Sequence, residues 1–375
     1  MQFTLTETQR DLKEFAAELA AEAFADRAFT WAGDLPFENR DRLADEGLLG
    51  LALPERYGGG GGTVVDVILA QEAVGRVCPD TAHVLSRSSM GPPRVIDKLG
   101  SEALKQRYLP PVCAGETTMS VAISEPGAGS DAGAMTTRAS VDGDTVTLDG
   151  EKRWVGKAEE ASAFLVWARF DDDDVGAVVV DTDAPGFSLG EARVNMAGHP
   201  QHDLHLDGCE LPREQVLAHG DESFRALLTE FNVERCHNAM MCVACGLRAF
   251  DEAMAYATDR EQFSQQISEF QGIEWKLADV ATRLEAARLL IYRAADSAVR
   301  AEPSRLETSM AKVLANEAGQ KAVDEALQIC GARGYQQGHP VEYLYRWVRG
   351  WKIAGGTVEV QRNGIARELK KHGLG

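Results

Sequence analysis

The stretch IEWKLADVATRLEAARLLIYRAADSAVR, residues 273–300, decides the fold because it combines helical periodicity with unusual length. Apolar side chains recur every three or four positions, at Ile273, Leu277, Val280, Leu284, Ala287 and Ile291. This spacing places them on one face of an α-helix, with the charged residues opposite. A long helix with one apolar stripe buries that stripe against other helices. The stretch therefore predicts a helical bundle in the C-terminal part of the chain.

The rest of the chain divides by its periodicity into three segments. Helical patterns broken by Gly and Pro fill residues 1–118, beginning at TETQ (6–9), which has the pattern of a capping box. Short alternating segments such as ASAFLVWARF (161–170), separated by Gly, Asp and Pro, fill residues 119–222. We expect a mainly α, α+β fold: an N-terminal helical domain (1–118), a middle antiparallel β-barrel or sandwich (119–222) and a C-terminal bundle (223–375).

Composition excludes several classes of function. The 375 residues are 44% hydrophobic and 26% charged, which is ordinary for a soluble globular protein. The net charge of -19 argues against a nucleic-acid partner, because phosphate binding requires clustered Lys and Arg. The opening MQFTLTETQRDLKEFAAELA contains neither a basic n-region nor a continuous apolar run. We therefore expect a cytoplasmic protein without a membrane partner.

Two patterns resemble metal sites only superficially. The string CVAC at 242–245 lies inside an apolar helical stripe and has no second Cys pair. His202 and His205 are three residues apart in an expected strand, so their side chains point to opposite faces. We predict no metal site.

The acidic stretch FDDDDVG at 170–176 is typical of a solvated turn between strands.

Three segments resemble acyl-CoA dehydrogenases. They are AISEPGAGSD (122–131), DREQFSQQISEFQGIEWKLADVATRLEAARLL (259–290) and AKVLANEAGQKAVDEALQICGARGY (311–335). The resemblance extends over essentially the whole chain, including LALPERYGG (51–59). It implies the acyl-CoA dehydrogenase fold with a C-terminal four-helix bundle. It also implies an FAD-dependent oxidoreductase that acts on a CH–CH bond of an acyl thioester.

In that family the first segment is a tight loop that contacts the isoalloxazine and pyrophosphate of FAD. The resemblance assigns flavin contacts to Ile123, Ser124, Gly129 and Ser130. Glycines in such a loop allow the backbone to approach the cofactor closely. Trp154 matches the aromatic residue stacked beside the flavin ring. Gly156 stands where the family usually has Thr, so one hydrogen bond to the flavin is expected to be missing.

Other matching positions belong to a flavin site shared between subunits. They are Arg260, Phe263, Gln271, Gln328 and Gly331. An Arg beside a pyrophosphate supplies a charge-assisted contact. Ala332 replaces the second glycine of the family's turn, which is expected to alter the backbone approach. The resemblance further implies a homotetramer, arranged as a dimer of dimers, with an electron-transfer flavoprotein or oxygen as the electron acceptor.

The turn KIAGGTVEVQR (352–362) departs from short- and medium-chain members of the family. In those members a Glu here removes the α-proton of the acyl thioester while the β-hydrogen leaves as hydride to flavin N5. Gly355 occupies that position and cannot act as a base. Its backbone N–H is expected to hold the thioester carbonyl, and the missing side chain to leave space for a branched or cyclic acyl group. Thr357 and Glu359 keep the family's FAD contacts.

A replacement base is predicted on the first long C-terminal helix. Isovaleryl-type and long-chain members carry their Glu there, and FNVERCHNAMM (231–241) places Glu234 at the matching position. Carrier-protein-linked prolyl dehydrogenases also have Glu-Arg-Cys on this helix. Arg235 and Gly355 are assigned to the substrate site. The simpler alternative is that Glu234 is a surface carboxylate or pairs with Arg235.

Several functions remain open. The thioester is carried by CoA or by an acyl or aminoacyl carrier protein. An enoyl-thioester reductase of the crotonobetainyl-CoA reductase type is an alternative, because such members also have a Gly-Gly turn and a Glu on this helix. A catalytically silent partner of a paralogous dehydrogenase and a flavin monooxygenase on the same fold are further alternatives.

Overall fold

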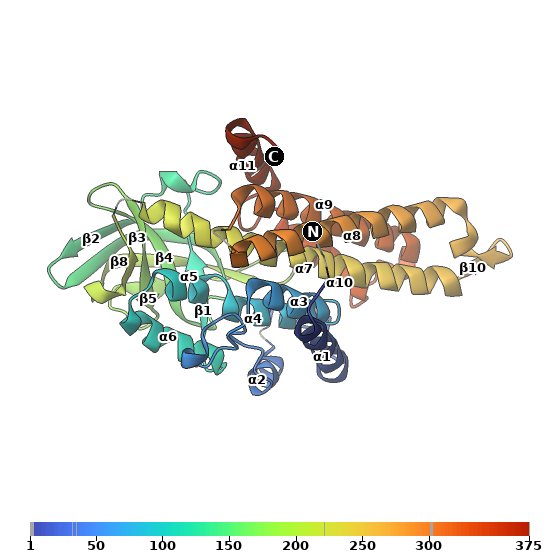
Figure 1. Cartoon of the computed structure of the whole chain (residues 1–375), viewed down its shortest axis with the longest axis horizontal. Helices are drawn as coiled ribbons and strands as arrows, with labels where there is room; N and C mark the ends of the chain where they lie inside the picture. Colours follow the sequence, from blue (N-terminus) through green and yellow to red (C-terminus); the bar gives the residue numbers. More distant parts are fainter. Residues whose placement is uncertain (1–3, 32, 35, 221, 301–302, 375) are drawn as a thin grey trace. The chain divides into compact units, whose positions relative to one another are not determined.

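The computed structural model describes residues 4–31, 33–34, 36–220, 222–300 and 303–374. The chain divides into two compact units, which we call the helical unit and the sheet unit. The helical unit comprises Met1–Ala32, Val64–Val84 and Asn232–Gly375, and the sheet unit comprises Gly33–Thr63 and Leu85–Phe231. Figure 1 follows the chain through both units. Each unit therefore combines segments that are distant in the sequence.

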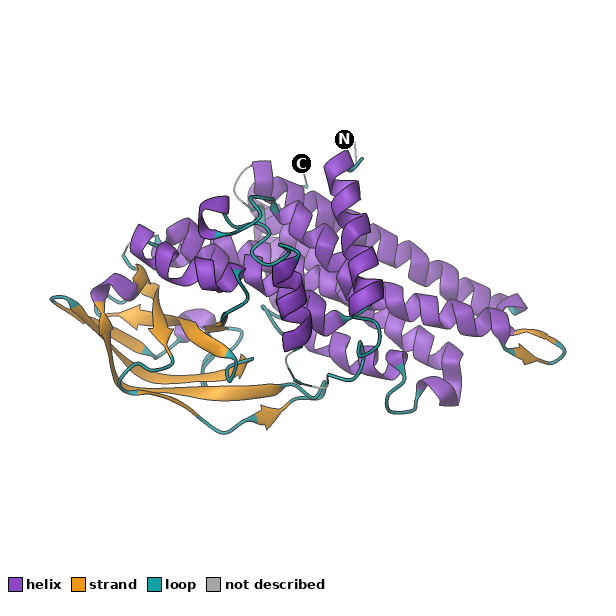
Figure 2. Ribbon diagram, turned by 90° about the horizontal axis from the view of Figure 1, so that it is seen from below, coloured by secondary structure: helices purple, strands orange, loops and turns teal. Residues whose placement is uncertain are grey.

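The long helices lie towards the end of the chain. They are α7 (Ser223–Asp259), α8 (Gln271–Arg300), α9 (Arg305–Gly334), α10 (Pro340–Trp351) and α11 (Val358–His372). The helical unit contains α8 to α11, α7 from Asn232 onwards, α1 (Glu7–Ala23), α3 (Val64–Gly75) and the first residues of α4 (Pro79–Ser89). The capping box is confirmed, because the Thr6 hydroxyl accepts from Gln9 N and the Gln9 side chain accepts from Thr6 N. A hairpin of β10 (Glu261–Gln262) and β11 (Gln265–Gln266) joins α7 to α8 (Figure 2).

The predicted stripe on α8 forms part of the helical core. Leu277, Val280, Leu284, Ala287 and Ile291 are buried, as the periodicity predicted. Small residues bring α7 and α9 close together. A side chain at Gly319 of α9 would lie within 2.5 Å of the Cys242 carbonyl oxygen of α7, and one at Gly246 would lie within 2.7 Å of Leu284. These glycines are therefore required by close helix packing.

The sheet unit contains one large mixed sheet. Its strands are β1 (Thr118–Ala122), β2 (Arg138–Asp142), β3 (Thr145–Gly156), β4 (Ala161–Phe170), β5 (Val175–Asp181), β6 (Phe187–Leu189), β7 (Arg193–Val194), β8 (Pro200–Pro212) and β9 (Val216–Ala218). The order is β6-β8-β3-β2-β4-β5-β9, with β1 paired to β4 and β7 to β8. Most pairs are antiparallel, as predicted, but β1 and β2 both pair with β4 in parallel. A tight hairpin would make neighbouring strands antiparallel. The chain instead leaves β1 through a loop, forms β2 and β3, and only then returns as β4, so β4 can lie parallel to β1 and β2.

The β4 strand is buried on both faces. Alternate residues Leu165 and Trp167 contribute to one apolar core, which includes side chains of α5 (Pro92–Leu99) and α6 (Glu102–Cys113). The intervening Phe164 and Val166 contribute to a second core, formed mainly by other strands. This alternation explains why the β4 sequence is nearly continuously apolar. The remaining helix, α2 (Phe37–Asp45), also lies in the sheet unit.

Local predictions within the sheet unit are also confirmed. His202 is buried and His205 is exposed, so the two imidazoles lie on opposite faces of β8. The acidic run lies in the exposed turn between β4 and β5. Among the described residues, no helix combines the length and apolar character needed to cross a bilayer. The three domain boundaries inferred from the sequence stay a prediction.

Candidate active site

A buried ion pair fixes the loop that follows β1. The Lys152 ammonium of β3 donates to Glu125 Oε1 at 2.8 Å and to the Ile123 carbonyl at 3.2 Å. Both side chains are essentially inaccessible to solvent. The Glu125 carboxylate also accepts from the Thr136 and Thr137 amides. Burial alone would raise the pKa of Glu125, but the Lys152 ammonium and these hydrogen bonds lower it to about 2.

The same loop closes into a tight turn with an open outer edge. Glu125 N donates to the Ala128 carbonyl at 2.9 Å, and Ala128 N donates back to Glu125 O. Ala128 is buried, whereas Gly127 and Gly129 have no atom within 4 Å of the position a Cβ would take. Ser124 is half-buried and Ser130 is exposed. The loop therefore presents two hydroxyls and unobstructed backbone on one side.

Trp154 is presented outward by an irregularity in β3. The register between β3 and β8 shifts between Lys152 and Val155, and Trp154 has a φ of 61°. Its side chain is 52% exposed, with the Arg193 guanidinium 5.7 Å from the ring centroid. A bulky residue with positive φ is strained, and such strain is typical of functional positions. Gly156, two residues on, faces open space where a side chain would be.

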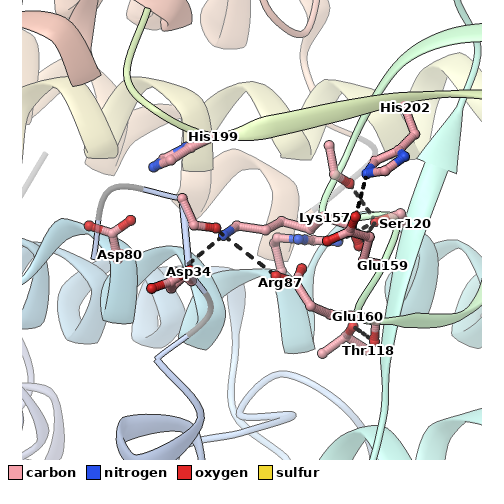
Figure 3. Close-up of polar contacts among 12 residues, drawn as sticks. Asp34, Asp80, Arg87, Thr118, Ser120, Lys157, Glu159, Glu160, His199 and His202 are labelled. Atoms are coloured by element: carbon pink, nitrogen blue, oxygen red, sulfur yellow. Dashed lines mark hydrogen bonds and ion pairs between the residues drawn. The ribbon is translucent and has the colours of Figure 1, made fainter. Parts of the chain in front are cut away.

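A polar network holds the end of β3, and Figure 3 shows its members Arg87, Ser120 and Lys157. The Ser120 hydroxyl donates to the Gly156 carbonyl at 2.9 Å and accepts from Arg87 at 2.6 Å. Buried Lys157, with a φ of 56°, donates to the Gly33 carbonyl at 2.9 Å. Thr118 donates to the Glu160 carbonyl. These contacts hold the strand that bears Trp154 in a single conformation.

The residues assigned to a shared flavin site are all exposed. They are Arg260, Phe263, Gln271, Gln328 and Gly331. Phe263 lies at the tip of the β10–β11 hairpin and is 90% exposed. Gly331 interrupts α9 with φ 59° and ψ −139°, and nothing lies within 4 Å of the place of its absent Cβ. Only glycine adopts this conformation readily, so the backbone there is open to a ligand.

The Gly-Gly turn is held by a buried lysine. Lys312 of α9 donates to the carbonyls of Ala354 and Gly356, at 2.9 Å for the latter. Burial and the positive charge of Arg235 lower the pKa of Lys312 to about 7, although the Glu234 carboxylate favours the charged amine. Thr357 then caps α11 by accepting from Val360 N, and Glu359 lies in the first turn of that helix. Lys312 thus fixes both carbonyls that flank Gly355.

The space beside Gly355 is filled. A Cβ on Gly355, whose φ is 64°, would lie 2.4 Å from Asn238 Nδ2 and 3.1 Å from Lys312 Nζ. The expectation that the missing side chain leaves space for a branched or cyclic acyl group is therefore wrong at this position. The side-chain amide of Asn238 on α7 lies where the first side-chain atom of a residue at 355 would be. The loss of the side chain at 355 and the presence of Asn238 are sterically linked.

Glu234 lies on the same helix as Asn238, one turn earlier. Its side chain is 18% exposed, and its Oε1 lies 3.9 Å from His237 Nε2. Its negative charge acts on Lys312 and favours the charged amine. Residues four apart on a helix lie on the same face. Glu234 therefore lies near the Lys312 side chain, on the face of α7 that contacts the Gly-Gly turn.

Arg235 does not pair with Glu234. Its guanidinium donates to the Asn232 side chain, and among the described residues its Nε has no hydrogen-bond partner. The side chain is only 7% exposed, and burial together with Arg305 lowers the pKa of Arg235 to about 10. Burying a cation without a carboxylate partner is energetically costly. Such a cation is therefore suited to interact with negative charge on a bound ligand. The alternative in which Glu234 forms an ion pair with Arg235 is therefore wrong.

Each unit, taken by itself, contains groups that suit part of a flavin cofactor. The loop at 123–130 supplies hydroxyls and open backbone, and Trp154 supplies an exposed ring on a strained backbone. Gly331 and the N-terminus of α11 supply further backbone donors, which suit phosphate groups. The sequence did not lead us to predict roles for Lys312, Asn238 and His237. Their polar side chains within otherwise apolar helical segments could have indicated them. No group of three or more His, Cys, Asp or Glu suited to a metal occurs among the described residues.

Comparison with known proteins finds matches over most of the chain. Three family models match: "Acyl-CoA dehydrogenase, N-terminal domain" at residues 6–116, "middle domain" at 120–209 and "C-terminal domain" at 222–370. A 3-sulfinopropanoyl-CoA desulfinase of Paraburkholderia xenovorans is 35% identical over 378 aligned positions, covering 98% of this chain and 97% of that protein. The caffeyl-CoA reductase-Etf complex subunit CarC of Acetobacterium woodii is 33% identical and covers 91% of each chain. Butyryl-CoA dehydrogenase from Megasphaera elsdenii superposes with a TM-score of 0.93 at 28% identity, covering 99% of this chain and 100% of that one.

The buried ion pair generates the first prediction. Replacing Lys152 by Met leaves Glu125 buried without its cation and should lower the free energy of unfolding at neutral pH by about 3–5 kcal/mol. The folded state binds fewer protons than the unfolded state between the folded pKa of about 2 and the ordinary 4.5. The stabilisation is therefore present above about pH 4.5 and is lost as pH falls. Urea unfolding should show the gap between wild type and Lys152→Met narrowing over this window.

The matched control for that variant is Arg225→Met, because Arg225 pairs with Glu222 at an exposed site. We expect a change below about 1 kcal/mol there. Equal effects of the two variants would contradict the structural role given to the buried pair.

The filled space beside Gly355 generates the second prediction. Gly355→Glu forces a side chain into positive φ and into Asn238, and should destabilise the protein by about 2–4 kcal/mol. Adding Asn238→Ala should recover part of this loss in a double-mutant cycle measured by urea unfolding. Gly350→Glu is the control, because nothing lies within 4 Å of a Cβ at Gly350. A Gly355→Glu variant as stable as wild type would show that Asn238 does not fill this space.

Proposed function

Because the chain belongs to the acyl-CoA dehydrogenase family, we propose that it catalyses α,β-dehydrogenation of an acyl thioester with Glu234 as the base that removes the α-proton. It is an FAD-dependent oxidoreductase that acts on CH–CH bonds. When bound, the flavin accepts the β-hydrogen as a hydride. The tasks left to the chain are to hold the thioester, remove a proton and stabilise the resulting negative charge.

One observation carries the assignment of Glu234. Asn238, one helical turn later on α7, lies against the place of the absent side chain at Gly355. Glu234 therefore projects from the helix that packs on this turn. In the family's short- and medium-chain members the base lies on the turn itself. Because α7 packs against this turn, we propose that a carboxylate on α7 reaches the same α-carbon. Glu234 is also only partly exposed, as a base protected from bulk water requires.

The surroundings suit the negative charge that develops as the α-proton leaves. Arg235 and Lys312 are buried cations near Glu234 and the Gly-Gly turn. Preorganised positive charge in a buried site stabilises an enolate-like transition state more strongly than it would in water. The Gly355 N–H is assigned to the thioester carbonyl. The positive φ of 64° at Gly355 sets the direction of this donor.

The flavin contacts are proposed as follows. Ile123, Ser124, Gly129, Ser130 and Trp154 contact the flavin of their own subunit, together with Thr357 and Glu359. Arg260, Phe263, Gln271, Gln328 and Gly331 contact the flavin of a neighbouring subunit in a homotetramer. Their exposure supports this assignment, since a large exposed aromatic such as Phe263 is typical of a contact surface. Sedimentation of the holoenzyme tests the assembly.

The carrier and the electron acceptor also belong to the proposal. We favour CoA as the carrier, because the relatives compared above act on CoA esters according to their names. An electron-transfer flavoprotein is the proposed acceptor, since one relative is named as a subunit of an Etf complex. Cytoplasmic location stays part of the proposal.

A reductase is the second candidate. A relative named caffeyl-CoA reductase, 33% identical, supports it. In that direction Glu234 returns a proton to the α-carbon. Anaerobic mixing separates the two functions: saturated thioesters should bleach the oxidised flavin of a dehydrogenase, whereas enoyl thioesters should restore the colour of the reduced enzyme. A panel of straight, branched and aminoacyl esters of CoA and of carrier protein identifies the substrate. If no ester in either direction changes the flavin spectrum, the proposed function is wrong.

The base assignment gives a third prediction. Glu234→Gln should slow flavin reduction by the preferred thioester by about 10²–10⁴-fold, because the amide cannot accept the α-proton. The FAD content and the dissociation constant of the thioester should stay near wild type. Stopped-flow absorbance and equilibrium titration measure these quantities.

Glu252→Gln is the control variant for this prediction, because Glu252 lies farther along α7 and pairs with Arg248. It should reduce the flavin at the wild-type rate. Unchanged reduction kinetics in Glu234→Gln would remove Glu234 from the mechanism.

A further inference from the structure

The imidazole of His237 lies next to the Glu234 carboxylate. Both belong to α7, three residues apart, and His237 Nε2 lies 3.9 Å from Glu234 Oε1. His237 is fully buried. A buried imidazole next to a carboxylate can orient it, provided that the nitrogen facing the carboxylate carries a proton.

The tautomer of His237 follows from its contacts with Gln71 of α3. The Gln71 side-chain nitrogen lies 3.0 Å from His237 Nδ1 and 3.0 Å from the His237 carbonyl oxygen. A carbonyl only accepts, so the group facing it is the amide NH₂ and not the amide oxygen. The same NH₂ then donates to Nδ1. The neutral ring therefore carries its proton on Nε2, on the side of Glu234.

Two further elements fix the plane of the ring. His83 of α4 stacks on His237 with centroids 5.4 Å apart and an interplanar angle of 10°. Trp351 of α10 meets His237 edge-on at 5.5 Å and 89°. Glu234 and His83 are the titratable groups identified against this ring, whereas α3 and α10 present an amide and an indole. The ring is thus held by α3, α4 and α10 while its Nε2 faces α7's carboxylate.

We infer that His237 is a positioning residue for the proposed base, holding one oxygen of Glu234 through Nε2–H so that the other oxygen faces the substrate α-carbon. This inference rests on the proposed function. The α-C–H bond breaks, an O–H bond forms on Glu234, and the electron pair passes into the thioester enolate. His237 neither gains nor loses a proton. At 3.9 Å the two atoms are beyond hydrogen-bonding distance, so the inference requires the contact to shorten when substrate binds, as catalytic contacts of unliganded sites often do.

His237→Leu and His237→Gln test the inference in the holoenzyme. Leu removes the donor, whereas Gln places an amide nitrogen close to the position of Nε2. The probe is the CoA ester that bleaches wild-type flavin most rapidly, together with acetyl-CoA, which has α-hydrogens but no β-carbon. Exchange of the acetyl-CoA hydrogens in D₂O measures α-proton removal apart from hydride transfer.

We expect His237→Leu to lower both the exchange rate and the flavin reduction rate by about 10- to 100-fold, the effect of losing one hydrogen bond to a charged group. FAD content and thioester dissociation constants should not change. The acid limb of the rate profile should move to higher pH, because the carboxylate loses a donor that favours its ionised form. His237→Gln should restore most of the rate. His205→Leu, at an exposed histidine, is the control.

Two results would overturn the inference. In the first, His237→Leu keeps the wild-type rate and pH profile while Glu234→Gln loses activity, so the base stands but His237 has no role. In the second, Leu and Gln variants fall equally and also lose FAD or thioester affinity, so His237 is only structural. If Glu234→Gln itself keeps full exchange and reduction rates, the proposed function fails, and the inference fails with it.

Discussion

A buried ammonium, assisted by the Gln361 side-chain amide, holds the Gly-Gly turn of the helical unit in shape. Lys312 projects from α9 and donates to the carbonyls on either side of Gly355. A turn of two glycines has no side chains of its own with which to maintain its shape, and both residues have positive φ. The lysine supplies the constraint from outside the turn. Arg235, Glu234 and Asn238 then acquire defined positions relative to that turn, because all three lie on the helix that packs beside it.

Buried polar groups are tolerated differently in the sheet unit and in the helical unit. Glu125 and Lys152 satisfy each other and the neighbouring backbone, so their burial is compensated. Within the part of the chain that the structure describes, Arg235 and Lys312 have no comparable carboxylate partner, and both have lowered pKa values. The first pair is a structural device that determines the shape of a loop. The second is a local excess of positive charge in a chain of net charge -19, which agrees with the substrate role that we propose for this region.

Periodicity predicted much of this structure because it depends on neighbours in the sequence. The stripe on α8, the capping box at Thr6 and the opposite orientations of His202 and His205 are local properties. The parallel pairing of β1 with β4 was not predictable in the same way, since it depends on where the chain returns. The empty position at 355 was evident from the sequence, but its filling by Asn238 was not. That contact requires α7 and the turn to be placed in three dimensions, which no short pattern encodes.

The contact between Asn238 and the place of a side chain at Gly355 has a consequence for the history of such a site. A glutamate introduced at position 355 would meet the amide of Asn238 and would need a strained positive φ, so it carries a cost in stability. A change at position 238 that removes the contact brings no catalytic group by itself. The two positions are therefore coupled: the mutational route to a base in the turn has its lowest cost when position 238 changes as well.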